Sequence, residues 1–301
     1  MALKALLVGI NQYDDRPLRG CVNDAQAMAE LLAAKHGLAA EDTRLLLDVQ
    51  ATRAAIIDGL RWLAEPDGDG APGQRVFLYA GHGTQQADTN GDEPDGADEC
   101  LMPFDYKAAG LLTDDTLREL YGGFLGQAKL LLLMDCCHSG TIHKDPFSDV
   151  RQRLMPLLPA EFKRIQAAKQ RFRDHKTELL AAQIRDIASR ELSAAEVEAK
   201  ARELGELVSK QPFGGAETAA NAVVFSACRA DQTAADARFG DEFHGAFTFF
   251  LSLALRGDGA MTYGQLGDHL TTALADSKFA QVPQLECDTA LLSQPFLGAA
   301  G

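Results

Sequence analysis

A cysteine and a histidine, each in a glycine-containing segment, stand directly after apolar runs that are typical of buried strands. His82 lies in Tyr-Ala-Gly-His-Gly-Thr (79–84), and Cys137 lies in Leu-Met-Asp-Cys-Cys-His-Ser-Gly (133–140). Catalysis by a thiolate needs a general base within hydrogen-bond reach and donors for the oxyanion. His82 can supply the base, Cys137 the nucleophile, and the backbone N–H groups of Gly83 and Cys137 the oxyanion donors. The pair therefore predicts a thiol hydrolase.

Each residue taken alone has a simpler interpretation. A cysteine that ends a strand is often an inert core residue, and a histidine between glycines can be a turn residue. The two together, each at a strand end, favour catalysis. Cys136 continues the alternation of the strand and should point into the core. His138 should point away from Cys137, because neighbours on an extended chain face opposite sides.

The elements that must hold this pair follow from an alternation of short apolar runs with helical patterns. Such an alternation is typical of a parallel sheet covered by helices. Helices are predicted over 24–34, with Asn23 as the cap, and over 53–63, capped by Thr52. In open α/β sheets, catalytic groups collect at the carboxyl ends of strands, so the histidine and the cysteine should meet at one edge. The predicted strands are Lys4–Ile10, Thr43–Leu47, Arg75–Ala80, Lys129–Asp135 and Ala222–Ala227.

Composition excludes several classes of protein. The 301 residues carry a formal net charge of -14, with a pI of about 4.9, which argues against a nucleic-acid partner. No apolar run approaches the roughly 20 residues that span a bilayer, so no membrane partner is expected. The six cysteines are scattered and the first residues lack a secretory pattern, which predicts a reducing, cytoplasmic setting.

A change of composition interrupts the α/β pattern. Residues 161–210 are rich in Ala, Glu, Lys, Arg and Leu, with apolar residues at helical spacing. This indicates a helical insertion over 145–220 within a single domain that spans 1–301. The insertion could be a cleavable linker, a lid, a docking surface or an ordinary solvated hairpin. If it recruits partners, the chain could instead be a catalytically silent interaction module.

Several motifs, in the same order along the chain, resemble those of the metacaspases, which are caspase-like cysteine peptidases. The resemblance implies a caspase-like three-layer αβα sandwich with a mostly parallel central sheet, and it places Cys137 and His82 at the dyad positions. It also implies a monomer that cleaves proteins after Arg or Lys, is activated by calcium and often processes itself. The matching stretches are Ala-Leu-Leu-Val-Gly-Ile-Asn-Gln-Tyr (5–13), Leu-Arg-Gly-Cys-Val-Asn-Asp-Ala (18–25), Tyr-Ala-Gly-His-Gly-Thr-Gln (79–85), Asp-Glu-Cys-Leu-Met-Pro-Phe-Asp (98–105), Leu-Thr-Asp-Asp (112–115), Asp-Cys-Cys-His-Ser-Gly (135–140) and Phe-Ser-Ala-Cys-Arg-Ala-Asp-Gln-Thr-Ala (225–234).

A pocket for a basic substrate residue needs carboxylates, because a guanidinium group pairs with them through two hydrogen bonds. Asp24 begins a predicted helix after a strand-end loop, and Asp135 immediately precedes the cysteine pair. The resemblance implies that these two aspartates, together with Cys21, line the S1 pocket, which receives the residue before the scissile bond. Asp24 also fits an ordinary first-turn position, where a carboxylate stabilises the helix.

Calcium is predicted as a cofactor from the resemblance. It implies ligands at Asp98, Asp114 and Asp115 and at an aspartate after the nucleophile, here Asp145. Asp145 lies one residue further from the nucleophile than the family pattern has it, and Thr113-Asp-Asp-Thr also matches a capped helix start. The acidic run over 88–99 does not form an EF-hand loop, because Glu93 stands where that loop needs glycine.

Overall fold

The computed structural model describes most of the chain. The described residues are 2–66, 73–87, 97–122, 129–137, 150–157, 160, 162–167, 170, 221–229, 232–257 and 259–298. The chain divides into two compact units. The larger unit takes its described residues from within 1–84, 99–156 and 213–301, and the smaller one from within 85–98 and 157–212.

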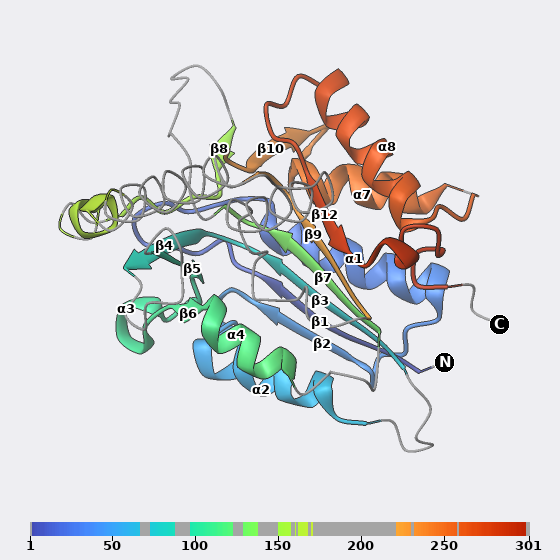
Figure 1. The fold of residues 1–301 in the computed structure, drawn as a ribbon, viewed down its shortest axis with the longest axis horizontal. Coiled ribbons are helices and arrows are strands. Elements are labelled where there is room, and N and C mark those ends of the chain that lie inside the picture. Colours follow the sequence, from blue (N-terminus) through green and yellow to red (C-terminus); the bar gives the residue numbers. More distant parts are fainter. Residues whose placement is uncertain are drawn as a thin grey trace, which may run out of the picture. The chain divides into compact units, whose positions relative to one another are not determined.

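The larger unit is built on a six-stranded sheet (Figure 1). Neighbouring strands pair in parallel, except that the last strand of the chain runs antiparallel to its neighbour. The sheet is therefore mixed and mostly parallel, as the alternating pattern predicts. In spatial order the strands are β12 (Gln284–Cys287), β9 (Ala222–Ser226), β7 (Lys129–Asp135), β3 (Gln74–Ala80), β1 (Leu3–Gly9) and β2 (Thr43–Leu47).

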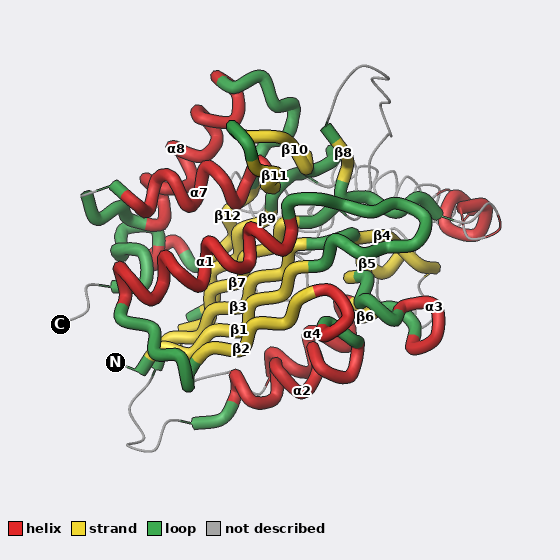
Figure 2. Tube along the Cα trace, turned by 180° about the vertical axis from the view of Figure 1, so that it is seen from behind, coloured by secondary structure: helices red, strands yellow, loops and turns green. Residues whose placement is uncertain are grey.

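Helices cover both faces of this sheet, which makes a three-layer αβα sandwich (Figures 1 and 2). Alternate residues of β1 pack into two different apolar clusters, Ala5 and Leu7 into one and Leu6 and Val8 into the other. Because both faces are buried, the strands read as nearly continuous apolar runs. One face carries α1 (Cys21–His36), α7 (Ala246–Arg256) and α8 (Tyr263–Asp276), and the other carries α2 (Arg53–Ala64) and α4 (Asp114–Tyr121).

One of the two predicted helix caps is wrong. The Thr52 side chain accepts a hydrogen bond from Ala55 N, which confirms the predicted cap of α2. Helix α1, however, begins at Cys21, and its N-cap is Gly20, which offers no side chain. Asn23 lies inside the first turn, where its amide donates to the Phe243 carbonyl. A tertiary contact has therefore replaced the local capping role that the residue type suggested.

Two small sheets complete the fold. The first consists of β11 (Glu242–Gly245), β10 (Ala235–Phe239) and β8 (Arg151–Gln152), and all its pairings are antiparallel. The second consists of β4 (Gly83–Ala87), β5 (Ala97–Leu101) and β6 (Leu112–Thr113). The short helix α3 (Tyr106–Ala109) and the 3-10 turns η1 (Asp48–Gln50) and η4 (Thr289–Leu291) lie in connections.

The predicted helical insertion over 145–220 lies largely outside the described residues. Within it, β8 is a strand, and residues 162–167 are helical. The insertion as a whole stays a prediction. Among the described residues, none of the helices is both long and apolar enough to span a membrane.

Candidate active site

The sheet places His82 and Cys137 side by side. Strands β3 and β7 are parallel neighbours in which Ala80 pairs with Asp135. His82 and Cys137 each lie two residues beyond that pair, at the carboxyl ends of strands about 4.8 Å apart. Cys136 belongs to the apolar cluster on the α2 side of the sheet, whereas Cys137 belongs to the cluster on the α1 side. His138 lies outside the described residues.

The ring of His82 is poised to accept a proton. The side chain is buried, and its Nε2 atom lies 2.7 Å from the Arg16 carbonyl oxygen. Because a carbonyl can only accept, Nε2 must carry the proton, which leaves the lone pair on Nδ1. Nδ1 is buried and has no hydrogen-bond partner among the described residues. Burial lowers the pKa of His82 to about 4, so the ring is neutral at pH 7.

The thiol of Cys137 is covered by the chain itself. Cys137 is only 1% exposed, and its Sγ atom contacts the backbone of Ala234. Sγ accepts from Ala234 N and lies 3.8 Å from the Ala234 carbonyl oxygen. Neither contact involves His82, so the two side chains are neighbours that are not joined to each other in this conformation.

Three aspartates surround one arginine beside the cysteine. The guanidinium group of Arg153 is fully buried and lies 2.5 Å from Asp24, 3.1 Å from Asp135 and 3.2 Å from Asp236. All three carboxylate side chains are also fully buried. A buried cation is stable only when it is paired and hydrogen-bonded, and this pocket provides both conditions.

The backbone of the same arginine meets both predicted oxyanion donors. The Arg153 carbonyl oxygen accepts from Gly83 N at 3.1 Å and from Cys137 N at 3.3 Å. Its backbone N–H donates to the Ala234 carbonyl oxygen at 3.0 Å. Arg153 therefore places its side chain among three carboxylates. Its carbonyl oxygen accepts hydrogen bonds from the backbone amides of Gly83 and Cys137.

The two predicted pocket aspartates are held by other buried groups. Asp24 accepts from Gly245 N and lies 2.9 Å from His244 Nδ1. Asp135 Oδ2 accepts from both the backbone N–H and the hydroxyl of Thr248. These contacts come from β11 and the first turn of α7, so the β11–α7 junction fixes the orientation of both carboxylates.

Gly245 is required by this packing. A Cβ atom on Gly245 would lie 2.6 Å from the guanidinium group of Arg153 and within contact distance of Asp135 Oδ2. Any larger residue would push into the ion cluster. The pocket therefore needs glycine at this position so that the backbone N–H can reach Asp24.

Burial and charge perturb the ionisable groups of the pocket. Burial raises the pKa of Asp135 to about 6, with the neighbouring Asp24 adding to the shift and Arg153 opposing it. Burial likewise raises the pKa of the Cys21 thiol well above its usual range, and the Arg153 charge opposes that shift. Burial would lower the pKa of His244, but its hydrogen bonds with Asp24 and Glu242 raise it.

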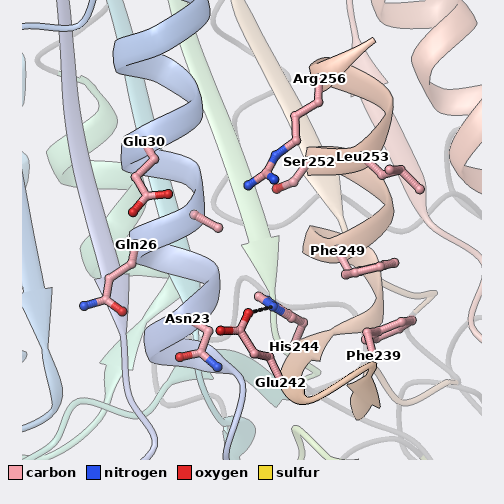
Figure 3. Close-up of a pocket in the computed structure, with 11 residues that line it drawn as sticks. Asn23, Gln26, Glu30, Phe239, Glu242, His244, Phe249, Ser252, Leu253 and Arg256 are labelled. Carbon is pink, nitrogen blue, oxygen red and sulfur yellow. Dashed lines mark ion pairs between the residues drawn. The ribbon is translucent and has the colours of Figure 1, made fainter.

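His244 also joins the ion cluster to a separate cavity. This cavity of about 310 Å³ lies between α1, α7 and the β10–β11 hairpin (Figure 3). Charged, polar and aromatic groups line it, so it suits a ligand of mixed character. Its lining residues are Asn23, Gln26, Ala27, Glu30, Phe239, Glu242, His244, Phe249, Ser252, Leu253 and Arg256.

Sequence reasoning missed two members of the ion cluster. Asp236 stands in the run Ala-Ala-Asp-Ala (234–237), where a lone acid in a short apolar strand indicates a buried charge that needs a partner. Arg153 carries no comparable local signal. It is one of several basic residues in the predicted insertion, and only the tertiary structure distinguishes it.

The predicted calcium ligands are only partly described. Asp98 is 3% exposed and accepts from Gln86 Nε2, and Asp114 is 4% exposed in the first turn of α4. Asp115 pairs with Arg118 at 2.9 Å. Within the described ranges, no three His, Cys, Asp or Glu side chains gather closely enough to hold a metal ion. Asp145 lies outside the described residues.

The sequence of the chain is similar to those of known proteins. The family model described as the caspase domain matches residues 2–292, nearly the whole chain. The chain belongs to the caspase domain family. It is 32% identical to Metacaspase-1A of Aspergillus niger over 96% of its own length and 71% of the relative. It is also 32% identical to Metacaspase-1 of Ajellomyces capsulatus, over 94% of its own length and 79% of that protein.

A solved structure supports the same fold. The crystal structure of protein GSU0716 from Geobacter sulfurreducens matches with a TM-score of 0.63 and 26% identity, over 99% of both chains. Family membership makes this protein a caspase-like cysteine endopeptidase, and its substrates are proteins. The prediction of a caspase-like αβα sandwich is thereby confirmed.

Proposed function

We propose that this caspase-domain peptidase cleaves proteins after Arg or Lys, with Cys137 as nucleophile and His82 as general base. The observation that carries the proposal is the position of Arg153, whose side chain fills the aspartate pocket while its carbonyl oxygen contacts Gly83 N and Cys137 N. A substrate residue before the scissile bond needs both of these contacts at once. Arg153 therefore stands in for the substrate residue at P1.

The reaction proceeds through an acyl-enzyme. His82 Nδ1 takes the proton of Cys137, and the thiolate attacks the scissile carbonyl carbon. The amides of Gly83 and Cys137 stabilise the negative charge on the carbonyl oxygen. His82 then protonates the leaving amine, and water hydrolyses the thioester to release the new carboxyl terminus and the thiol.

The charge of the pocket selects a cation. Asp24, Asp135 and Asp236 together outnumber the single buried positive charge of Arg153 by two. An acidic substrate residue would add a fourth buried negative charge, which is strongly unfavourable in a fully buried site. Arginine should be preferred over lysine, because its planar guanidinium group contacts several carboxylates at once.

We also propose that calcium activates the enzyme and binds Asp98, Asp114 and Asp115, with Asp145 as the fourth ligand. These residues supply the carboxylate oxygens that calcium prefers. Asp98 and Asp114 are almost completely buried, and buried carboxylates are stabilised by pairing or by a metal ion. Calcium would supply positive charge to these carboxylates, and no step of peptide cleavage passes through it.

Two further proposals concern the state of the protein in the cell. The six cysteines are all free, which supports a reducing, cytoplasmic location. The sheet holds the whole proposed dyad and pocket within one chain, which supports a monomeric enzyme. Self-processing belongs to the proposed activity as well, because a basic residue of the chain already occupies the pocket.

Peptide assays test the central proposal. Matched fluorogenic peptides with Arg, Lys, Gln or Asp before the scissile bond separate charge from size. We expect hydrolysis of the arginyl and lysyl peptides only, and covalent labelling of Cys137 by a chloromethyl ketone that carries arginine. Equal hydrolysis of the glutaminyl peptide would contradict the role of the aspartates.

A further inference from the structure

Residues 151–155 cross the proposed catalytic centre as an extended peptide. On the amino side of Arg153, strand β8 pairs with β10, with Gln152 opposite Ala235. On the carboxyl side, Met155 N donates to the Gly83 carbonyl oxygen at 3.0 Å, and Thr84 Oγ1 donates to the Met155 carbonyl oxygen at 3.0 Å. The segment is therefore held by backbone hydrogen bonds on both sides of the arginine, which is how an extended substrate binds to strand edges.

We propose that the bond between Arg153 and Leu154 is the self-cleavage site of this protein, and that before cleavage the segment blocks the pocket. The proposal rests on the proposed function, and it adds the bond, its direction and its intramolecular course. Arg153 is the residue on the amino side of the cut because its guanidinium group already contacts all three aspartates. The new amino terminus is Leu154.

The position of the carbonyl group identifies the bond. Of the two peptide bonds of Arg153, only the one to Leu154 has its carbonyl oxygen on the amides of Gly83 and Cys137. In the reaction, the Cys137 sulfur bonds to the Arg153 carbonyl carbon, the C–N bond to Leu154 breaks, and the Leu154 nitrogen takes a proton from His82. Water then cleaves the thioester, giving the Arg153 carboxylate and the free thiol.

Nearby basic residues are placed less well for cleavage. The side chain of Arg151 donates to the Pro17 carbonyl oxygen and does not enter the aspartate pocket. Lys163 and Arg164 lie in the helical residues 162–167. A helix must unfold before its backbone can pair with strand edges, so these two bonds need an additional, costly step.

The dyad is not yet in a reacting arrangement. Cys137 Sγ is held by the backbone of Ala234, and His82 Nε2 is held by the Arg16 carbonyl. The thiol must therefore leave Ala234 before it can reach the Arg153 carbonyl carbon, while the His82 contact with Arg16 keeps Nδ1 as the proton acceptor. The segment therefore acts first as a built-in inhibitor and then as the first substrate.

Intact mass and amino-terminal sequencing of the purified full-length chain test the proposal. Incubation with excess calcium should yield one fragment that ends at Arg153 and one that begins at Leu154, whereas incubation with a chelator should leave the chain intact. Cys137→Ala should remain uncut. The rate constant should not change with protein concentration, because the reaction is intramolecular. Active enzyme added to Cys137→Ala should cut it far more slowly.

Three variants distinguish the arginine from its surroundings. Arg153→Gln should lose this cut, Arg153→Lys should keep it at a reduced rate, and the matched control Arg151→Gln should keep it unchanged. Arg153→Gln is checked for folding by near-UV circular dichroism. Its hydrolysis of an arginyl peptide should equal or exceed that of the uncut wild type, because the segment has lost the guanidinium contacts that hold it in the pocket.

The outcomes separate this proposal from the one on which it rests. If the protein hydrolyses arginyl peptides while the bond between Arg153 and Leu154 stays intact, the cleavage site is wrong and the peptidase assignment stands. A first cut at another bond would likewise show that the proposed cleavage site is wrong and would leave the peptidase assignment intact. If neither the wild type nor Arg153→Gln hydrolyses an arginyl peptide, the proposed specificity itself fails.

Discussion

Asp135 and Arg153 form an ion pair at 3.1 Å in which neither side chain is exposed to solvent. The pair joins the residue before the cysteine pair to a residue of the segment that lies across the site. Burying these charges is unfavourable, because both lose their hydration. Two hydrogen bonds from Thr248 to Asp135 offset part of this desolvation free energy. The same geometry underlies the proposed specificity, since a side chain without a positive charge would leave these buried carboxylates without a counter-ion.

Removing one carboxylate should weaken the use of arginyl substrates. For Asp135→Asn and Asp236→Asn we expect kcat/KM to fall roughly 10- to 150-fold, because a hydrogen bond to a charged group contributes about 1.5–3 kcal/mol. The matched control is Asp241→Asn, because Asp241 is fully exposed on the β10–β11 turn. Equal losses in the control would show that net charge, and not the pocket, sets the rate.

The pH dependence should follow Asp135. Burial raises its pKa to about 6 in the occupied pocket, against the opposing Arg153 charge. A bound cation favours the ionised carboxyl, so the pKa of the empty pocket must lie higher. We therefore expect kcat/KM, which reports the empty pocket, to fall with decreasing pH before kcat does. Pre-steady-state rates on an arginyl peptide across pH 5–8 measure the acidic limbs of kcat/KM and of kcat. A fall of kcat at a higher pH than the fall of kcat/KM would contradict this account.

Thr248 should act as a positioning residue for Asp135. Its hydroxyl donates to Asp135 Oδ2 and stabilises the ionised form, which lowers the pKa of that carboxyl. Thr248→Val removes this bond with little change of volume, so the acidic limb of kcat/KM should move to higher pH and KM should rise more than kcat falls. Thr248→Ser should restore the wild-type profile. A uniform loss of activity with an unmoved limb would indicate a purely structural role.

The two adjacent cysteines should behave in opposite ways. Cys137→Ala should abolish peptide hydrolysis and active-site labelling, because it removes the nucleophile. Cys136→Ala should retain most of the activity, because Cys136 packs in the apolar cluster on the opposite face of the sheet, and burial raises the pKa of its thiol well above the usual range. Labelling of both variants by the same arginyl chloromethyl ketone, followed by peptide mapping, decides between the two thiols.

Calcium dependence can be measured directly. We expect chelation to abolish self-cleavage and calcium to restore it, with magnesium much less effective because it demands a stricter octahedral geometry. Asp114→Asn should weaken calcium binding in titration calorimetry, while Asp276→Asn, at the end of α8, should not. Full activity in chelator, together with no heat of calcium binding, would exclude calcium as the activator.

Apolar runs in the sequence predicted the strands and the positions of their carboxyl ends, because these depend mainly on neighbouring residues. The predicted bounds of β2 and β7 agree with the structure. Strand β7 is buried and apolar along almost its whole length, which is typical of a central parallel strand, whereas β2 is a half-buried edge strand in which only the last three residues are apolar. The neighbourhood of His82 and Cys137 followed from the general rule for strand ends. The start of α1 did not, since the amide of Asn23 is used by a residue more than 200 positions away.

The ion cluster around Arg153 could not be predicted from the sequence. Asp24, Asp135 and Asp236 come from three distant parts of the chain, and a fourth part supplies Arg153. Acidic residues near a predicted nucleophile indicate a cationic ligand, but no periodicity says that the ligand is a side chain of the same molecule. That information lies in the pairing of β8 with β10, which depends on tertiary contacts.

The order of strands in the central sheet has a consequence for how the polypeptide can be divided. Strands β1, β2, β3 and β7 precede Arg153, whereas β9 and β12 follow it, and β7 pairs with β9 along five residue pairs. Two halves made separately, ending at Arg153 and beginning at Leu154, would each expose an apolar sheet edge that only the other half completes. We expect them to reassemble when coexpressed, which makes this fold suitable for split-protein complementation.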